Sequence, residues 1–492
     1  MINYFLENKI FLSKNSTEKI FILKEISAGI SKGNICHRVA KENILKHISN
    51  YPESYREIIY SGILIEEKRF TTTIPTEIIR FLNDDIYTYF LFLQLTEKFK
   101  FKPDSAFFEE ILASYLDQPD LRRNMLNWSI RFCVNRNEIK ALKNIFLLPF
   151  SNTEKNQAFD FICDVALFEL RKTNSNFNAQ TIDMHFIDLM VLGRTMSKNY
   201  KETIKKISEK VFNEDIQIML NVIESNITLI DMDKVGLNES MQLLKRHGKR
   251  LNELFPISPY DFILFFSNIL QNKPNNSKTL KEKITKICEE INQSGTYKNE
   301  ELTSAQIISY RLILIVLFTN KDFEEYHKFL SAILKKYPRI FYLRSSVFPP
   351  FLLIILTQVY IKLDQYKKAQ RIIQYLGKAI DNEQIYYSPY IKAAYVLAKA
   401  NFLNYTGNYP NALSEISNGL EISRDNCFYT MEITFRLMKI DALKHNNDIE
   451  NINEAIKQLL NFLTMHKLTM PSFTNLNKDD FDHTFNILKT YK

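Results

Sequence analysis

Apolar residues recur at helical spacing through most of the chain, and in its last third this pattern itself repeats. Four apolar stripes begin there at a constant interval of 43 residues, on Phe323, Tyr366, Tyr409 and Ile452. A second apolar helix and a polar turn precede the stripes, as at Leu352–Ile361 followed by Asp364 and Gln365. A period of this size predicts stacked helical hairpins that share one continuous core, an α-solenoid.

The turn between the two helices of a hairpin carries a short motif. Gly407-Asn408-Tyr409-Pro410-Asn411-Ala412 resembles the Gly-x-Tyr-x-x-Ala junction of tetratricopeptide repeats, and Asp364 to Ala369 is similar but lacks the glycine. The other two copies depart further, with Tyr326 at the alanine position and Ile452 at the aromatic position. The period also exceeds the usual 34 residues or so. The resemblance covers about residues 305 to 465 and implies an interaction scaffold that has no catalytic residues.

The remainder of the chain divides into two further parts. We predict an N-terminal helical unit at 1–95, an irregular helical region at 96–300 with degenerate hairpins as one interpretation, and repeats with a C-terminal capping helix at 301–492. In the middle part, Asp104-Ser105 and Ser258-Pro259 are typical helix starts, since a capping side chain before the first turn satisfies its free amides.

The first 95 residues have a different pattern. Helices are predicted at Ser16–Ser31, Lys41–Ile48 and Glu53–Tyr60, followed by a β-branched, extended segment at Gly62–Ile74. Pro75 should then open another helix, with Glu77 in its first turn. This unit is either a winged-helix-like module with the extended segment as its wing, or a cap on the solenoid. The cations available for phosphate contacts are Arg38, Lys41, Lys46, Lys68 and Arg69.

Composition strengthens the all-α prediction. Only 10 of 492 residues are glycine, and sheets, barrels and phosphate-binding loops need glycine for bulges and tight turns. The five cysteines include no CxxC pair, which favours a reducing, cytoplasmic location over a disulfide framework. The N-terminus shows no secretory pattern, and no apolar run approaches the length of a membrane span.

Positive charge is concentrated in one region. The net charge is +8, and between Lys245 and Lys286 there are nine Lys or Arg residues against three acids. The cluster Lys245, Arg246, Lys249 and Arg250 is a candidate basic patch for nucleic acid or an acidic partner, or simply a solvated helix face. Lys335–Arg344 interleaves cations with aromatic rings, as a surface for single-stranded nucleic acid can, or it packs between hairpins.

Signatures of catalysis are missing from the sequence. It has no GxGxxG, Walker, HExxH or GxSxG motif and no metal-spaced His/Cys cluster. We therefore expect no enzyme activity, no catalytic residues, no metal and no cofactor.

The pattern as a whole predicts an all-α fold of right-handed superhelical hairpin repeats, a tetratricopeptide-like α-solenoid with the small N-terminal unit. The expected function is a non-catalytic scaffold or adaptor that binds a protein or peptide along a concave face formed by the first helix of each hairpin. The candidate groove residues are Tyr310, Arg311, Gln358, Lys392, Tyr395, Lys399, Arg436 and Lys439. The alternative is a nucleic-acid-binding regulator, with a winged-helix-like module ahead of a helical-repeat sensor domain.

Overall fold

The fold is described from a computed structural model. It describes residues 6–32, 37–69, 76–172, 175–193, 195–231, 233–270, 273, 277–293, 302–337, 348–446 and 448–468. The chain forms two compact units, an N-terminal unit of residues 1–150 and a C-terminal unit of residues 151–492. The boundaries predicted at residues 95 and 300 stay predictions, and the predicted capping helix falls largely in 469–492, outside the described residues.

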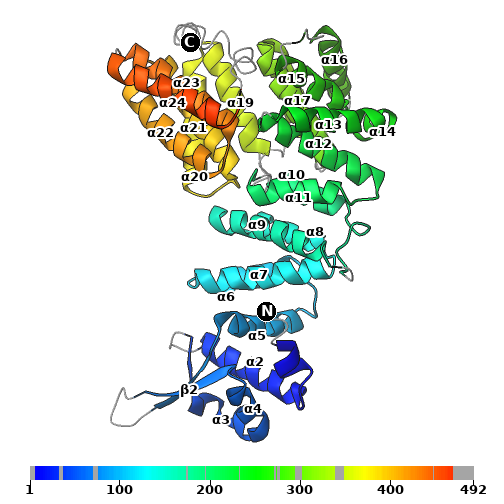
Figure 1. The fold of residues 1–492 in the computed structure, drawn as a ribbon, viewed down its shortest axis with the longest axis vertical. Helices are drawn as coiled ribbons and strands as arrows, with labels where there is room; N and C mark the ends of the chain where they lie inside the picture. Colours follow the sequence, from blue (N-terminus) through cyan, green and yellow to red (C-terminus); the bar gives the residue numbers. More distant parts are fainter. Residues whose placement is uncertain are drawn as a thin grey trace. The chain divides into compact units, whose positions relative to one another are not determined.

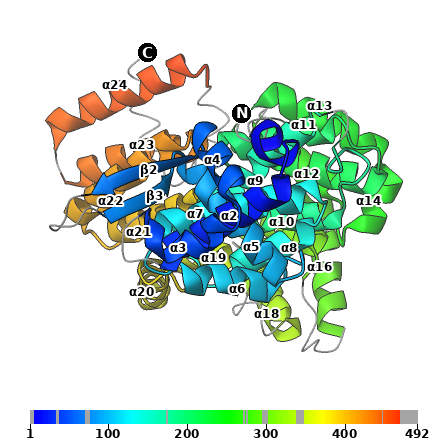
Figure 2. The ribbon, with the colours of Figure 1, turned by 90° about the horizontal axis from the view of Figure 1, so that it is seen from below.

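The N-terminal unit begins with helices arranged around a small antiparallel sheet. After the π-helical turn η1 (Glu7–Phe11), its elements are α2 (Ser16–Lys32), β1 (Val39–Ala40), α3 (Lys41–Ser49), α4 (Pro52–Tyr60), β2 (Leu64–Arg69) and β3 (Thr76–Phe81). The strand order is β1-β3-β2, and β2 and β3 lie side by side (Figures 1 and 2). Of the segment predicted as a wing, residues 70–74 lie outside the described part of the chain.

The helix predicted to begin at Pro75 is wrong, because Thr76–Phe81 is the central strand β3. Ile78 and Ile79 are buried, and they face Glu67 and Glu66 of β2 in the ladder. Proline before a segment can open a helix or stand at the start of a strand. Here the β-branched residues and the non-local partner β2 decide for the strand.

Four more helices complete the N-terminal unit, α5 (Asp84–Lys98), α6 (Ser105–Ser114), α7 (Pro119–Asn135) and α8 (Ile139–Leu147). The predicted cap of α6 is confirmed, since the Asp104 side chain accepts a hydrogen bond from the Phe107 amide. Trp128 of α7 donates to Thr88 of α5 at 3.3 Å, so a buried indole N–H and a buried hydroxyl satisfy each other.

The C-terminal unit consists of helices in the part of the chain that is described. The first eight are α9 (Asn152–Glu169), α10 (Met184–Gly193), α11 (Lys198–Ser208), α12 (Glu214–Ile230), α13 (Lys234–Arg246), α14 (Gly248–Leu254), α15 (Pro259–Leu270) and α16 (Ser277–Gln293). They are followed by α17 (Ser304–Thr319), α18 (Phe323–Lys336), α19 (Phe348–Lys362), α20 (Tyr366–Asp381), α21 (Pro389–Tyr405), α22 (Tyr409–Asp425), α23 (Tyr429–His445) and α24 (Ile449–Met465). No described helix is long and apolar enough to cross a bilayer.

Helices α17 to α24 form four hairpins, α17/α18, α19/α20, α21/α22 and α23/α24. The second helices α18, α20 and α22 begin on Phe323, Tyr366 and Tyr409. Two residues earlier the backbone is left-handed, with φ of 60° at Lys321, 56° at Asp364 and 75° at Gly407. A left-handed residue ends a helix and reverses the chain, and glycine adopts it without steric cost. The helical-hairpin fold class is thereby confirmed.

Small side chains lie where the two helices of a hairpin pack together. Ala369 and Ala412 are fully buried and Ala455 is 4% exposed. Tyr326, which replaces the alanine in the first hairpin, is also fully buried. The first helices α15, α17, α19, α21 and α23 each pack against the next (Figure 1), so they form one continuous layer.

A polar clamp joins the start of the C-terminal unit to its later hairpins. Asn152 of α9 donates to the Ile385 carbonyl at 3.1 Å and accepts from the Tyr387 amide at 3.1 Å. The fully buried Tyr386 places its hydroxyl 3.1 Å from both the Asn156 Oδ1 and the Gly193 carbonyl. We call these contacts the α9 clamp. It connects α9 and α10 to the loop between α20 and α21.

Candidate functional site

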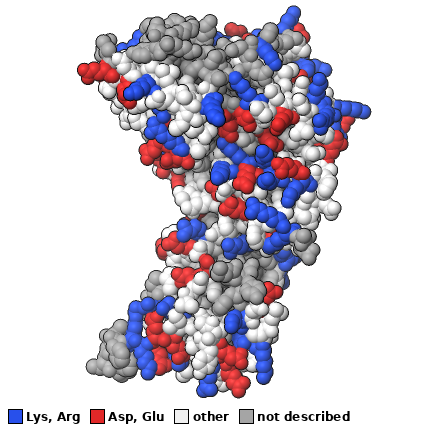
Figure 3. Space-filling model, viewed as in Figure 1, with Lys and Arg blue, Asp and Glu red and all other residues white. Residues whose placement is uncertain are grey.

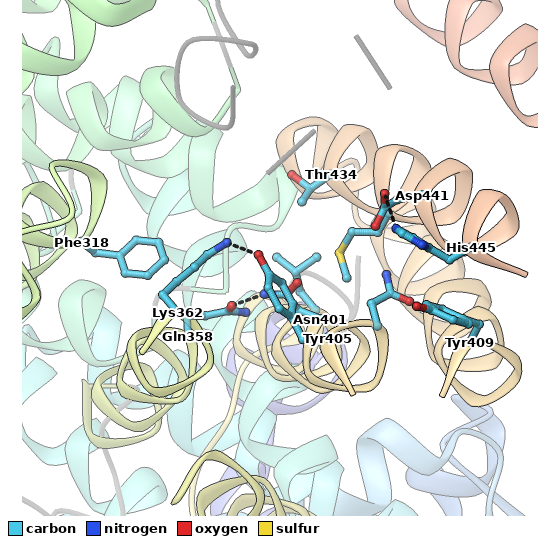
Figure 4. A pocket seen from close by; sticks show the side chains of 12 residues that line it. Phe318, Gln358, Lys362, Asn401, Tyr405, Tyr409, Thr434, Asp441 and His445 are labelled. Carbon is cyan, nitrogen blue, oxygen red and sulfur yellow. Dashed lines mark hydrogen bonds and ion pairs between the residues drawn. The ribbon is translucent and has the colours of Figure 1, made fainter. Parts of the chain in front are cut away.

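A groove opens along the layer of first helices, beside the carboxyl-terminal parts of α17, α19 and α21 and most of α23. It has a volume of about 470 Å³. Its lining is Phe318, Gln358, Lys362, Leu397, Asn401, Asn404, Tyr405, Tyr409, Thr434, Met438, Asp441 and His445 (Figure 4). These residues come from α17, α19, α21 and α23, apart from Tyr409 at the start of α22. We call this the first-helix groove.

Two side-chain bonds cross from α19 to α21 in the groove (Figure 4). Asn401 Nδ2 donates to Gln358 Oε1, and Lys362 Nζ donates to the Tyr405 hydroxyl. The partners in each pair are 43 residues apart. Equivalent positions of successive hairpins therefore face each other. We call the two bonded pairs, Gln358–Asn401 and Lys362–Tyr405, the rungs of the groove.

The α23 side of the groove presents a flat aromatic wall. The rings of Tyr409 and His445 stack with centroids 5.4 Å apart and planes 8° apart. His445 Nε2 lies 3.7 Å from the Asp441 carboxylate (Figure 4). Tyr405, on the α21 side, is 42% exposed, and the Lys362 ammonium lies over its ring, 4.8 Å from the ring centroid.

The chemistry of the groove suits binding. Its polar groups are mostly neutral amides and phenols, which donate and accept hydrogen bonds without carrying charge. Asn404 Oδ1 is buried and has no hydrogen-bond partner among the described residues, and such a buried acceptor is costly to leave unpaired. No group of three or more His, Cys, Asp or Glu side chains in the described ranges is arranged to hold a metal ion.

Of the groove residues predicted from sequence, Gln358 lines the groove. Tyr310 and Arg311 of α17 are buried, with 2% and 4% exposed. Tyr395 is also buried, its hydroxyl donates to the Ile373 carbonyl at 3.4 Å, and burial raises its pKa to about 12. These three side chains pack inside the hairpin layers.

The other four predicted residues are basic, and the structure places them outside the groove lining. Lys399 forms an ion pair with Glu415 at 2.6 Å, and Arg436 forms one with the buried Glu432 at 2.7 Å. Lys392 is exposed and Lys439 partly exposed. The structure thus brings only Gln358 to the groove from the predicted set.

Sequence reasoning missed Lys362, Asn401, Tyr405 and Tyr409. The signal that could have found them is the period itself, since Asn401 and Tyr405 stand one interval after Gln358 and Lys362. Lys362, Asn401 and Tyr405 lie near the carboxyl end of a first helix, and Tyr409 is the first residue of the second helix α22.

The basic patch predicted at Lys245–Arg250 lies on α13 and α14 in the C-terminal unit. Arg250 makes two hydrogen bonds of 2.7 Å to Asp215 and pairs with Glu253 at 2.7 Å. The hydrogen bond from this guanidinium holds the pKa of the Asp215 carboxyl below its usual value. A small hollow there is lined by Arg246, His247, Lys249 and Arg250 together with Glu214 and Glu253. The cations therefore share this surface with carboxylates.

Three of the cations predicted for phosphate contacts in the N-terminal unit, Arg38, Lys41 and Lys68, also lie beside carboxylates. Lys41 lies 2.9 Å from Glu66 and 3.0 Å from Glu77, and the hydrogen bond to Glu66 raises the pKa of Lys41. Arg38 lies 3.8 Å from Glu67, and Lys68 lies 3.8 Å from Glu77. On the face drawn in Figure 3, acidic and basic side chains of the N-terminal unit interleave. Lys335 and Lys336 are the last residues of α18 and Tyr337 follows it, and the remainder of the aromatic–basic segment, residues 338–344, lies outside the described residues.

Comparisons with known proteins were made at the level of family, sequence and structure. No family model matches the chain, and no curated protein matches it. Among solved structures it is similar to a signal transduction ATPase with numerous domains from Pyrococcus horikoshii that carries a tetratricopeptide repeat sensor. The match has 12% sequence identity and a TM-score of 0.31 and covers 92% of this chain. The chain spans 64% of that protein's length.

Proposed function

We propose that this chain is a non-catalytic scaffold or adaptor that binds a protein or peptide in the first-helix groove. The observation that carries the proposal is the lining: amides, rings and an amine from successive first helices converge on one open groove. In this proposal the hairpins form a tetratricopeptide-like array with a 43-residue period. The array works in the cytoplasm, where the buried thiols of Cys133, Cys163 and Cys288 remain reduced.

The physical basis is preorganisation. Binding costs conformational freedom on both sides, and side chains already held by packed helices lose little of it. The rungs Gln358–Asn401 and Lys362–Tyr405 hold four groove residues in place before a ligand arrives. A ligand therefore meets a surface of fixed spacing.

Selection from a displayed library of random peptides on the full chain tests the proposal. We expect selected peptides to bind the wild type and to lose about tenfold in affinity on Tyr405→Ala, since a ring at a groove contributes on the order of 1–2 kcal/mol. Tyr375→Ala is the matched control, because Tyr375 is 54% exposed and lies on the second helix α20, outside the groove lining. If both variants bind the selected peptides equally well, the groove is not the peptide-binding site.

A nucleic-acid-binding regulator is the second candidate, and one observation favours it. The elements from α2 to β3 have the order and strand pairing of a winged-helix module. The charge of the helix that would contact DNA favours the scaffold instead. The helix α4, which such a module would insert in the major groove, carries Glu53 and Glu57 against a single Arg56, and phosphates repel carboxylates.

The regulator is tested by salt-dependent binding of duplex and single-stranded DNA to the full chain. If it holds, binding falls steeply with salt and is lost in the triple variant Lys245→Glu, Arg246→Glu, Lys249→Glu. Arg250 is left unchanged in that variant because it binds Asp215. No binding near physiological salt would exclude this candidate and leave the scaffold standing.

A further inference from the structure

We propose that a second cavity of the C-terminal unit binds an aliphatic polyamine, a chain of methylene groups that carries several ammonium groups. The cavity lies between α11, α12, α13 and the junction of α22 with α23, and we call it the α13 cavity. Its volume is about 890 Å³, within the range of about 300–1,000 Å³ that is typical of small-molecule sites. It shares no lining residue with the first-helix groove, so the site is separate from the proposed peptide function.

Negative charge prevails in the lining of the α13 cavity. Three lysines line it, and all of them come from α11. Six carboxylates line it, and they come from the surrounding helices and their caps: Glu202, Glu224, Asp231, Asp233, Glu239 and Asp425. Three negative charges are therefore in excess, which favours a cationic ligand over an anionic one.

Half of these carboxylates are free to bind a cation. The side chains of Glu202, Glu239 and Asp425 make no hydrogen bond or ion pair with any residue in the described ranges. Two of the others are destabilised as anions, because burial raises the pKa of both Glu224 and Asp231. A bound cation would stabilise the ionised form of these two groups.

A buried hydroxyl in the cavity wall gives independent support for a ligand. Ser240 of α13 is 4% exposed and lines the α13 cavity. Its hydroxyl makes no hydrogen bond to any part of the chain that the structure describes. A buried hydroxyl without a partner costs free energy. An ammonium group carries three N–H donors, so a polyamine in the cavity would supply the partner that Ser240 lacks.

The carboxylates are too dispersed for a single metal ion. Within the described ranges, no group of three or more His, Cys, Asp or Glu side chains could hold one. Glu224 and Asp231, for example, are separated by two turns of α12, which is about 10 Å along the helix axis. A polyamine distributes its positive charges along a flexible chain, so its ammonium groups can meet separate carboxylates.

The surface between the charged groups is apolar. Ile227 of α12 and Val235 and Leu243 of α13 line the same cavity. Val235 is 69% exposed, although a valine side chain gains free energy when it is covered. The methylene groups of a polyamine would cover these side chains, as the stems of lysine and arginine cover apolar surface elsewhere in proteins.

The lysines of α11 compete for the acidic lining. Lys201 Nζ lies 2.7 Å from Asp231 Oδ1. The charge of Lys205 opposes the effect of burial on the pKa of Glu224, so these two groups lie close together. Removal of the Lys205 charge should therefore strengthen the binding of a polyamine, whereas it would weaken the binding of an anion.

Isothermal titration calorimetry of the full chain with spermine tests the proposal, and magnesium chloride is the control ligand. We expect spermine to bind at least about tenfold tighter than Mg²⁺, because Mg²⁺ demands closely grouped ligands and releases its water reluctantly. Absence of spermine binding, or equal affinity for Mg²⁺, would overturn the polyamine site. Tyr405→Ala should leave the affinity for spermine unchanged, so the result does not depend on the first-helix groove.

Four variants locate the binding site. Glu239→Gln and Asp425→Asn should each weaken spermine binding up to about fivefold, and Lys205→Met should strengthen it by a similar factor. Glu421→Gln is the matched control, since Glu421 is exposed and lies one turn before Asp425 on α22, outside the cavity lining. Equal weakening by the Glu421 variant would reduce the effect to general charge and overturn the site, and so would weaker binding by Lys205→Met.

Ser240→Ala separates a ligand contact from a structural role. Removal of the unpartnered hydroxyl should raise the melting temperature of the free protein, since nothing in the described chain bonds to it. The same variant should weaken spermine binding severalfold. Unchanged affinity for spermine in Ser240→Ala would contradict the assignment of this hydroxyl to the ligand, and circular dichroism of each variant verifies that the helices are intact.

Discussion

At the scale of single residues, Lys155 is a charge held inside the C-terminal unit. It lies on α9 and is 7% exposed, and burial lowers its pKa to about 8, opposed in part by Glu383 and Glu154. Its pKa in the unfolded chain is near the ordinary 10.5. Between these two values the unfolded state binds more protons than the folded state, so stability rises with pH. Below about pH 8 the ammonium is buried at a cost.

We therefore predict that Lys155→Met is more stable than the wild type near neutral pH. The wild type should gain up to about 3 kcal/mol between about pH 8 and pH 10.5 from this group, and the variant should lack that gain. Urea unfolding at several pH values measures the difference, because other titrating groups are common to both proteins. If the unfolding free energies of the two proteins change with pH in parallel, the pKa of Lys155 is not lowered by burial.

Residue burial also explains which groove residues could be predicted from sequence. A helical pattern places Tyr310 or Arg311 on a helix, and their polar atoms suggest a surface. Yet α17 packs against α15, α18 and α19, and both side chains are buried. Gln358 was predicted as a polar residue on a first helix, and it is the member of the predicted set that lines the groove. Tyr405 was missed because it lies in the last turn of α21, beside a junction that was interpreted only as a turn.

At the scale of elements, close packing of α22 on α23 depends on one glycine. A Cβ atom added at Gly419 would lie 2.1 Å from the ring of Phe435. Alanine is the better helix former by roughly 1 kcal/mol, so propensity alone predicts that Gly419→Ala stabilises the protein. The clash reverses this expectation, because overpacking typically lowers the free energy of unfolding by about 1–3 kcal/mol, which exceeds the gain in helix propensity.

We predict that Gly419→Ala lowers the melting temperature and that Phe435→Leu in the same chain restores part of the loss. Gly248→Ala is the matched control, since a Cβ there meets no atom within 4 Å. Gly248→Ala should leave the melting temperature unchanged or raise it. Thermal unfolding followed by circular dichroism makes the comparison. An unchanged melting temperature for Gly419→Ala would show that α22 and α23 move apart to accept the added methyl group.

Elements with local signals could be predicted from sequence, and those that depend on distant partners could not. The hairpin helices follow from apolar stripes and polar turns, and α18, α20 and α22 start on the marker residues. The strand β3 was predicted as a helix because Pro75 is an equally good local signal for either. Its partner β2 and the strand β1, which pair on its two edges, determine the outcome.

At the scale of the whole molecule, the α9 clamp distinguishes the C-terminal unit from an open stack of repeats. In an ideal array each repeat contacts only its neighbours, and local segments unfold independently. Asn152 and Ile385 are 233 residues apart in sequence, yet they are joined directly. Loss of the clamp should therefore affect two distant segments together.

We predict that Asn152→Ala lowers stability by about 1–3 kcal/mol, because it leaves a carbonyl and an amide without their partner. Hydrogen exchange should speed up both in α9 and in residues 385–387, with little change in α24. Asn451→Ala is the control, since the Asn451 side chain donates to Asp448, three residues away, in an exposed contact. Faster exchange confined to α9 would show that the clamp does not couple the two segments.

The clamp also has a consequence for synthesis of the protein. A ribosome adds about 5–20 residues per second, and Ile385 follows Asn152 by 233 residues. Asn152 of α9 therefore waits about 12 to 47 s before Ile385 is added to the chain. During that interval α9 lacks the hydrogen bonds that Asn152 later makes with Ile385 and Tyr387. Slow codons or chaperone contacts between α10 and α20 would lengthen or protect this stage, and the final closure can occur only after α20 has left the ribosome.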